Sequence, residues 1–150
     1  MRVVIQRVSK SSVTIKKKIV SSINYGMLIF LGIEETDTKE DIDWLVKKIS
    51  QLRIFNDKNE IMNLNVNEIN GEIMVISQFT LHAKTKKGNR PSYIRAAKPN
   101  LAIPLYNKFI NALNMLVKNE IKNGEFGAMM KIDLINDGPV TILIDSKQKE

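Results

Sequence analysis

The sequence predicts a single α+β domain over residues 1–150, built as a mixed, strongly curved β-sheet or open barrel with helices packed to one side. Three observations predict this class. Short β-branched or alternating segments outnumber the segments with helical periodicity, several of them are joined by short turns, and no linker or internal repeat divides the chain. A chain of 150 residues is also long enough to bury a core.

The N-terminal quarter reads as strands. Residues 2–8 are rich in β-branched side chains, and residues 12–15 and 19–23 flank three lysines, which predicts a hairpin with a charged tip. Residues 26–33 form a continuous apolar run that begins at a glycine, which is typical of a strand buried on both faces.

The next segment predicts a helix. Thr38 is a suitable N-cap, and Asp41 stands where a carboxylate completes a capping box. One apolar stripe follows, with Trp44 beside it as a packing residue; the stripe consists of Ile42, Leu45, Val46, Ile49 and Leu52. Residues 53–55 then predict a short strand, 56–59 a turn and 63–70 a loop.

The second half contains three more predicted strands and one helix. Residues 73–76 form a buried strand, and a helix is expected over 99–117, with Pro104 near its start. Its buried face is expected to hold Leu105, Phe109, Ala112 or Leu113, and Leu116. Strands at 130–135 and 140–144 are separated by a predicted turn at 136–139, and the tail from Lys147 is expected to be frayed.

Composition narrows the possible functions. The formal charge of +7 favours anionic partners: nucleic acid, phosphorylated ligands or a membrane surface. The absence of cysteine excludes disulfides, thiolate catalysis and Cys-ligated metal, and fits a reducing cytosol. His82 is the only histidine, which argues against a His-based metal cluster and a Ser–His–Asp triad. We expect neither a signal peptide nor a membrane span, since the apolar runs are short.

The common nucleotide, dinucleotide, zinc-hydrolase and serine-hydrolase motifs are absent. Two polar clusters remain. In the first, the strand at 73–76 runs into Ser77, Gln78, Phe79 and Thr80, whose backbone N–H groups could bind an oxyanion. A cationic loop follows, with Lys84, Lys86, Lys87, Arg90, Arg95 and Lys98. The plain alternative is a core strand followed by a solvated loop.

The second cluster spans residues 136–141. A Gly-Pro pair between strands is usually an ordinary turn, and that reading stays open here. The sharper hypothesis is a cis bond between Gly138 and Pro139, which would redirect a carbonyl and place rigid backbone acceptors in a pocket.

Together these two clusters resemble the paired signature motifs of the D-aminoacyl-tRNA deacylases, also called D-tyrosyl-tRNA deacylases. The first motif is Ser-Gln-Phe-Thr-Leu at 77–81, and the second is Asn-x-Gly-Pro-x-Thr at 136–141. The start of the chain, residues 85–91 and the chain length also resemble that family. The resemblance implies a homodimeric cytosolic enzyme that needs no cofactor and hydrolyses the ester linking a D-amino acid to tRNA.

The resemblance also implies roles for individual residues. A cis Gly138–Pro139 pair would enter the partner's active site, hold the substrate α-amino group with its carbonyls and reject L-residues, while glycyl-tRNA would be cleaved. Arg7 would brace this pair, and the N–H groups around Gln78 and Phe79 would face the ester carbonyl. Thr80 matches a residue once cast as the nucleophile, although assistance by the ribose 2′-hydroxyl suits a site with no base beside Thr80.

Further residues are assigned on the same basis. Three positions match the pocket for the terminal adenosine, with plain core packing as the alternative: Ala102, Phe126 and Met130. The cationic loop would meet tRNA phosphates, which suits an enzyme that acts on many tRNAs. Met129 departs from the aspartate of many relatives and is expected to be peripheral, and His82 is assigned no role.

Two other functions remain open. An RNA-binding module without catalysis would keep the cationic loop but would need exposed aromatic side chains for base stacking, and Tyr93 is the only aromatic inside that loop. An esterase that uses Thr80 as nucleophile on small substrates is the second alternative.

Overall fold

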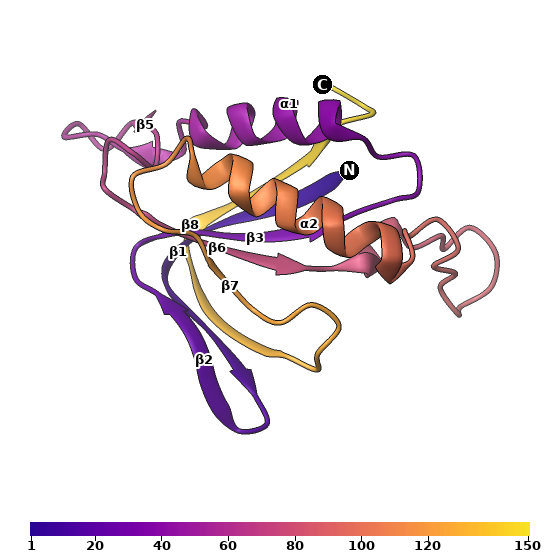
Figure 1. The fold of residues 1–150 in the computed structure, drawn as a ribbon. Coiled ribbons are helices and arrows are strands. Elements are labelled where there is room, and N and C mark those ends of the chain that lie inside the picture. Colours follow the sequence, from indigo (N-terminus) through magenta and orange to yellow (C-terminus); the bar gives the residue numbers. More distant parts are fainter.

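The fold is a curved, nearly closed β-sheet with two helices against one face (Figure 1). A computed structural model describes residues 1–150. The strand order is β2-β1-β3-β6-β7, with β8 paired to the other side of β1. The strands are β1 (Arg2–Ile15), β2 (Lys18–Ile23), β3 (Gly26–Gly32), β6 (Glu72–Ser77), β7 (Lys122–Asn123) and β8 (Lys131–Asp145). The α+β class expected from the sequence is confirmed.

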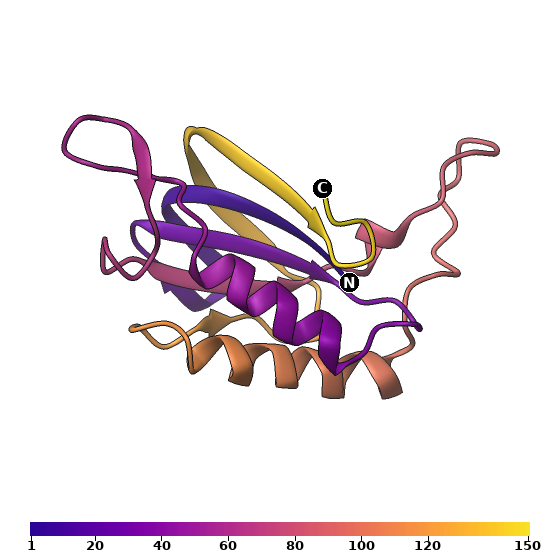
Figure 2. The same cartoon turned by 90° about the horizontal axis from the view of Figure 1, so that it is seen from above.

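Both helices lie on the same face because both are crossovers between parallel strands. α1 (Lys39–Ser50) connects β3 to β6, and α2 (Pro99–Asn114) connects β6 to β7. Right-handed crossovers in one direction along a sheet place their helices on one side, and Figure 2 shows the two side by side. The larger core of 23 buried residues fills the space between helices and sheet. Neither helix is long and apolar enough to cross a membrane.

The opposite face of the sheet is covered by parts of the same sheet, which curls back over its central strands. The β1–β2 hairpin and the first half of β8 curl over β3 and β6 and enclose a second cluster of six buried residues: Val8, Val13, Ile23, Leu28, Met74 and Ile76. β3 is therefore buried on both faces, as its continuous apolar run predicts. Lys16 and Lys17 form the hairpin tip with positive φ angles of 48° and 65°.

The largest difference from the sequence-based expectation concerns residues 136–139, which do not form a turn between two strands. β8 continues through them, paired with β1 on both sides: Asn136 opposes Val8, and Thr141 opposes Gln6. Residues 137–140 thus stand opposite Arg7 alone and bulge out of the ladder. The Asn-Asp-Gly-Pro pattern was wrongly read as a chain reversal because a bulge uses the same residue types. β1 is likewise one continuous strand through residues 9–11.

Several boundaries also differ. The strand expected at 53–55 begins only at Phe55, and β4 (Phe55–Asn56) pairs with β5 (Met62–Leu64), which the sequence did not predict. β7 was also missed, because two exposed polar residues carry no strand signal. α2 ends at Asn114, so Leu116 lies beyond it and is 39% exposed instead of buried.

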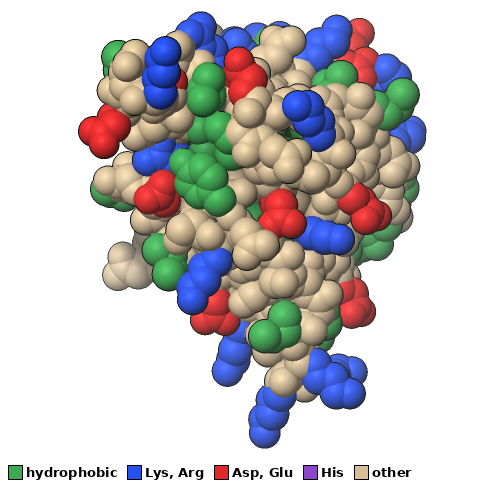
Figure 3. All heavy atoms as spheres, turned by 90° about the vertical axis from the view of Figure 1, so that its left-hand side faces the viewer, with side chains coloured by type: hydrophobic (Ala, Val, Ile, Leu, Met, Phe, Trp, Pro, Cys, Tyr) green, Lys and Arg blue, Asp and Glu red, His purple; other side chains and the backbone are tan.

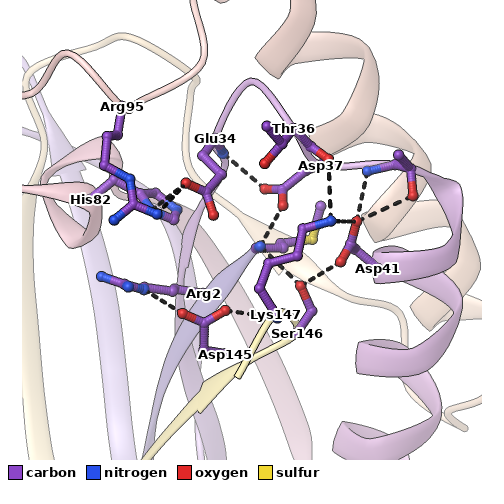
Figure 4. Close-up of polar contacts among 12 residues, drawn as sticks. Arg2, Glu34, Thr36, Asp37, Asp41, His82, Arg95, Asp145, Ser146 and Lys147 are labelled. Carbon is purple, nitrogen blue, oxygen red and sulfur yellow. Dashed lines mark hydrogen bonds and ion pairs between the residues drawn. The ribbon is translucent and has the colours of Figure 1, made fainter. Parts of the chain in front are cut away.

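The N-terminal end of α1 holds the C-terminal end of β8 (Figure 4). The Asp41 carboxylate accepts the Thr38 backbone N–H at 2.8 Å, as the capping box predicts, and also the Ser146 hydroxyl at 2.6 Å and the Lys147 ammonium at 2.7 Å. Burial opposes ionisation of Asp41, but these hydrogen bonds outweigh it and lower its pKa. The expectation of fraying from Lys147 is wrong, because this ion pair fixes the residue.

Candidate active site

A cavity of about 530 Å³ opens where the parallel strands β3 and β6 end. Crevices at the carboxyl ends of parallel strands are common ligand sites. Leu31 and Ser77 stand at these strand ends, Ala102 comes from the first turn of α2, and residues 126–130 close the remaining wall. Twelve of the sixteen lining residues are hydrophobic, so polar groups reach the cavity chiefly from the chain after β6.

The predicted motif after β6 forms a tight turn at the edge of this cavity. Ser77, Gln78 and Phe79 line it, and a single 3₁₀ turn, η1 (Phe79–His82), follows. The Gln78 N–H donates to the Leu31 carbonyl at 2.8 Å, so this N–H is already used. The first N–H groups of a helix have no acceptor within it, which leaves those of Phe79 and Thr80 as the candidates for binding an oxyanion.

Gly32 allows this turn to pack closely on β3. A β-carbon at Gly32 would lie 2.9 Å from the Leu81 β-carbon and 3.1 Å from the Gln78 carbonyl oxygen. A side chain at this position would therefore displace η1 from the strand end. The glycine at the end of β3 thus fixes where the motif begins.

Thr80 is not placed as an activated nucleophile. Its hydroxyl accepts a hydrogen bond from the Gln78 side-chain amide at 2.6 Å, and no carboxylate or imidazole hydrogen-bonds to it. His82 is 1% exposed, and neither ring nitrogen has a hydrogen-bond partner. Burial lowers the pKa of His82. The ring does not act as a base for Thr80, because it forms no hydrogen bond with the Thr80 hydroxyl.

Three residues predicted to form a nucleoside pocket meet in the same cavity: Ala102, Phe126 and Met130. Phe126 packs edge-to-face on Tyr106 at 5.6 Å, and the Tyr106 hydroxyl donates to the Val75 carbonyl at 2.8 Å, which anchors this wall to β6. A β-carbon on Gly124 would lie 2.4 Å from the Met130 sulfur, so Met130 packs directly over the glycine. Met129 is 93% exposed at the cavity mouth, as expected for a peripheral residue.

The Gly138–Pro139 pair does not line this cavity. Its peptide bond is cis, as hypothesised, and both residues are exposed on the β8 bulge. The bulge stands opposite Arg7, which pairs with Met27 at the beginning of β3, whereas the cavity lies at Leu31 near its end. Four residues of strand separate the two places by about 13 Å.

Arg7 supports the bulge through hydrogen bonds of its guanidinium group. Its guanidinium donates to the Asp137 carbonyl at 3.0 Å, to the Ile54 carbonyl at 2.8 Å and to the Asn56 side chain at 3.0 Å. Arg7 is only 6% exposed, so its position is fixed by packing as well as by hydrogen bonds. Arg7 thus contacts the segment that leads into Gly138 and Pro139, and its role in bracing that pair stays a prediction.

The cationic loop leaves the cavity edge after η1 and returns at α2. Backbone hydrogen bonds between Lys84 and Ser92, of 2.8 and 3.0 Å, close its base. Five of its six predicted phosphate-binding side chains form no ion pair: Lys84, Lys86, Lys87, Arg90 and Lys98. Arg95 instead pairs with Glu34 at 2.8 Å (Figure 4). On the side of the molecule in Figure 3, further cations gather at the projecting end formed by the β1–β2 hairpin.

Two site features were missed by the sequence analysis. Glu34 is 5% exposed and ties the cationic loop to the end of β3 through Arg95. Tyr93 packs edge-to-face on Phe79, with ring centroids 5.0 Å apart. Neither contact leaves a local signal, because the partners lie far apart in sequence.

Comparison with known proteins decides the family. A sequence profile described as D-Tyr-tRNA(Tyr) deacylase matches residues 4–145. The chain belongs to this family. A D-aminoacyl-tRNA deacylase of Flavobacterium psychrophilum is 63% identical over 150 residues, and one of Bacteroides fragilis is 64% identical over 150 residues. Both alignments cover all of this chain and all of the relative, and the expected enzyme class, a D-aminoacyl-tRNA deacylase, is confirmed.

Solved structures agree with this deacylase fold. A structure described as the c-Myc DNA unwinding element binding protein superposes with a TM-score of 0.92 at 37% identity, over 97% of this chain and 98% of that chain. A second, described as a probable eukaryotic D-amino acid tRNA deacylase, gives a TM-score of 0.80 over 95% of this chain and 97% of that chain. At 16% identity the second comparison concerns the fold alone.

Proposed function

We propose that this deacylase hydrolyses the ester between a D-amino acid and the 3′ end of tRNA and spares the L-ester. The observation that carries the proposal is the cavity at the ends of β3 and β6, which joins a polar backbone turn to an apolar wall. The backbone N–H groups of Phe79, which lines the cavity, and of Thr80, the next residue, suit an ester carbonyl. The wall formed by Ala102, Phe126 and Met130 suits the adenine ring of the terminal nucleotide.

In this proposal, main-chain atoms distinguish the D-ester from the L-ester. The carbonyl groups of Gly138 and Pro139 accept hydrogen bonds from the substrate α-amino group, and the side chain of an L-residue would then collide with the same backbone. Such a screen contacts only the α-amino group and the α-carbon of the substrate, so it accepts D-amino acids with many different side chains. Glycine has no β-carbon, and glycyl-tRNA is therefore also a substrate.

A homodimer completes the site. Because the Gly138–Pro139 bulge lies about 13 Å along β3 from the cavity of its own chain, it serves the cavity of a partner. The bulge lies opposite the beginning of β3 and the cavity lies at its end, and this separation supports the arrangement. β8 also exposes apolar side chains on either side of the bulge, with Ile135 50% and Leu143 67% exposed, and a partner subunit would cover this surface.

The reaction needs no protein nucleophile. A water molecule adds to the ester carbonyl carbon, the bond to the ribose O3′ breaks, and one proton of that water ends on O3′. The N–H groups of Phe79 and Thr80 stabilise the oxyanion that forms in between. The neighbouring 2′-hydroxyl helps to activate the water, which fits a Thr80 hydroxyl with no base beside it. During this reaction the cationic loop binds phosphates of the tRNA acceptor stem.

The test is a paired assay on D-Tyr-tRNA and L-Tyr-tRNA with the purified protein. The proposal expects release of D-tyrosine and an intact L-ester. Equal rates on both esters would contradict the chiral screen. A non-catalytic RNA-binding module, an alternative that the sequence alone left open, would bind both substrates and release neither amino acid.

A further inference from the structure

The mouth of the cavity carries an exposed aromatic pair that the proposed reaction does not use. Phe79 and Tyr93 meet edge-to-face, with ring planes at 76° and centroids 5.0 Å apart. Phe79 is 57% exposed and Tyr93 39% exposed, so both rings keep surface open to solvent. Phe79 lines the cavity, whereas Tyr93 belongs to the cationic loop. The pair therefore bridges the apolar cavity and the cationic loop.

The surrounding contacts hold Tyr93 in place. Ser92 is bonded to Lys84 across the base of the loop, and the Tyr93 carbonyl accepts the Ala96 N–H at 3.0 Å. Arg95, two residues further on, is tied to the buried Glu34 at 2.8 Å, and the Ala97 N–H donates to the Ile33 carbonyl at 2.9 Å. The ring thus stands on a loop segment anchored at both sides, which suits a preformed binding surface.

Charge and position identify the occupant. Every tRNA ends in a short single strand, and unpaired bases are bound by stacking on aromatic rings beside cationic side chains. Phe79 lines the cavity and contacts Tyr93, and the loop that carries Tyr93 also carries four cations that form no ion pair: Lys84, Lys86, Lys87 and Arg90. A strand whose last nucleotide fills the cavity would pass its next base over this pair.

We propose that Tyr93, supported by Phe79, is a stacking platform for the penultimate nucleotide of the aminoacyl-tRNA. The inference rests on the proposed function, because it assumes that the terminal nucleotide occupies the cavity. It adds a second base subsite and predicts that a full tRNA is bound better than an aminoacyl nucleoside.

The experiment compares Tyr93→Ala and Tyr93→Phe on two substrates, D-Tyr-tRNA and 3′-O-D-tyrosyl-adenosine. Loss of the ring is expected to raise KM for D-Tyr-tRNA by roughly 10-fold, and to leave KM for the adenosine ester unchanged. Tyr93→Phe keeps the ring and is expected to behave as the wild type. The wild type is expected to bind a D-Tyr-tRNA with an abasic penultimate nucleotide more weakly, by a similar factor. Loss of that base should not weaken binding to Tyr93→Ala any further, because the base and the ring form the same contact.

Tyr25 offers a matched control. It packs edge-to-face on Phe55 at 75° with centroids 5.4 Å apart, and it is 38% exposed, but it lies outside the cationic loop. Tyr25→Ala is expected to leave KM for D-Tyr-tRNA unchanged. Equal effects of Tyr93→Ala on both substrates, or none on D-Tyr-tRNA, would overturn the platform. If the wild-type protein cleaves neither substrate, the proposed function fails instead.

Discussion

The hydrogen bond between Gln78 and Thr80 bears on whether the Thr80 hydroxyl or a water molecule attacks the ester. The Gln78 amide donates to the Thr80 hydroxyl at 2.6 Å, and no base is within hydrogen-bonding reach of that hydroxyl. An unactivated hydroxyl is a weak nucleophile. In the proposed mechanism, Thr80 therefore contributes only to the shape of the turn after β6, and water attacks the ester.

Thr80→Ala is expected to lower kcat for D-Tyr-tRNA by less than about tenfold, because it removes one hydrogen bond and no reacting atom. Loss of a true nucleophile lowers kcat by roughly 10⁴-fold or more. Single-turnover hydrolysis distinguishes these outcomes, and Thr80→Val controls for side-chain volume. A variant with no measurable turnover would restore Thr80 as the nucleophile.

Arg7 is the side chain on which the bulge depends. Lysine keeps the charge but has no planar fork, so it cannot contact the Asp137 and Ile54 carbonyls together. Arg7→Lys is expected to lower kcat/KM for D-Tyr-tRNA by roughly 10- to 100-fold, and to reduce the preference for the D-ester.

Arg2 provides the control for that substitution. It also lies on β1 and pairs with an aspartate of β8, Asp145, at 2.7 Å, but it does not contact the bulge. Arg2→Lys is expected to leave the D-to-L rate ratio unchanged. If Arg7→Lys lowers thermal stability but keeps the wild-type ratio, Arg7 is structural and does not position the Gly-Pro pair.

Among the elements, the start of α1 makes stability depend on pH. Hydrogen bonds hold the folded-state pKa of Asp41 below its ordinary value of 3.8. The ionised carboxylate therefore stabilises the fold at neutral pH, and this contribution is lost as pH falls below the ordinary value toward the lowered one. Asp41→Asn is expected to cost about 2 kcal/mol at pH 7.

Urea unfolding at pH 7 and at pH 3 measures this effect. The difference in unfolding free energy between the wild type and Asp41→Asn should narrow at pH 3, because the Asp41 carboxylate of the unfolded chain is then largely protonated while the native one is still ionised. A difference that stays constant between the two pH values would show that the lost stability is unrelated to the charge of Asp41.

The cationic loop is expected to determine salt dependence. Replacing Lys86 and Lys87 with glutamine should raise KM for D-Tyr-tRNA and reduce the slope of log KM against log salt by roughly 1.5, since two phosphate contacts are lost. Lys16 and Lys17, at the β1–β2 hairpin tip, are the matched pair on another projection of the molecule. An equal change in slope for both pairs would mean that the loop makes no special contact with tRNA.

Elements with local signals were predictable from the sequence, and those that depend on distant pairing were not. The Thr38–Asp41 cap and the lysine-tipped hairpin are set by neighbouring residues. The continuity of β8 depends on β1, and the Arg95–Glu34 pair joins residues 61 apart. Ser77 was found as part of the polar cluster after a buried strand, whereas Met130 was found only through the family resemblance, because only the folded sheet brings the two to one cavity.

For the whole molecule, the curved sheet is the reason for proposing that two chains form each site. Its two ends carry different halves of the proposed site: the cavity at the ends of β3 and β6, and the braced bulge opposite the beginning of β3. In the proposed homodimer, a twofold axis would exchange these ends between two subunits, so each dimer would have two equivalent complete sites.

The most direct test combines two defective subunits in one dimer. Gly138→Ala disables the bulge, because its β-carbon would lie 2.7 Å from a Val140 methyl group at a φ of 130°. Ala102→Trp fills the cavity, since Ala102 is 4% exposed within its wall. Each variant alone should be inactive on D-Tyr-tRNA. In a heterodimer purified through two different tags, one cavity and one bulge remain intact on opposite chains.

If the bulge acts in the partner's cavity, that heterodimer has one complete site and should show about half of the wild-type activity per dimer on D-Tyr-tRNA. If each chain uses its own bulge, the heterodimer has no complete site and should be as inactive as the two variants alone, which would contradict the account.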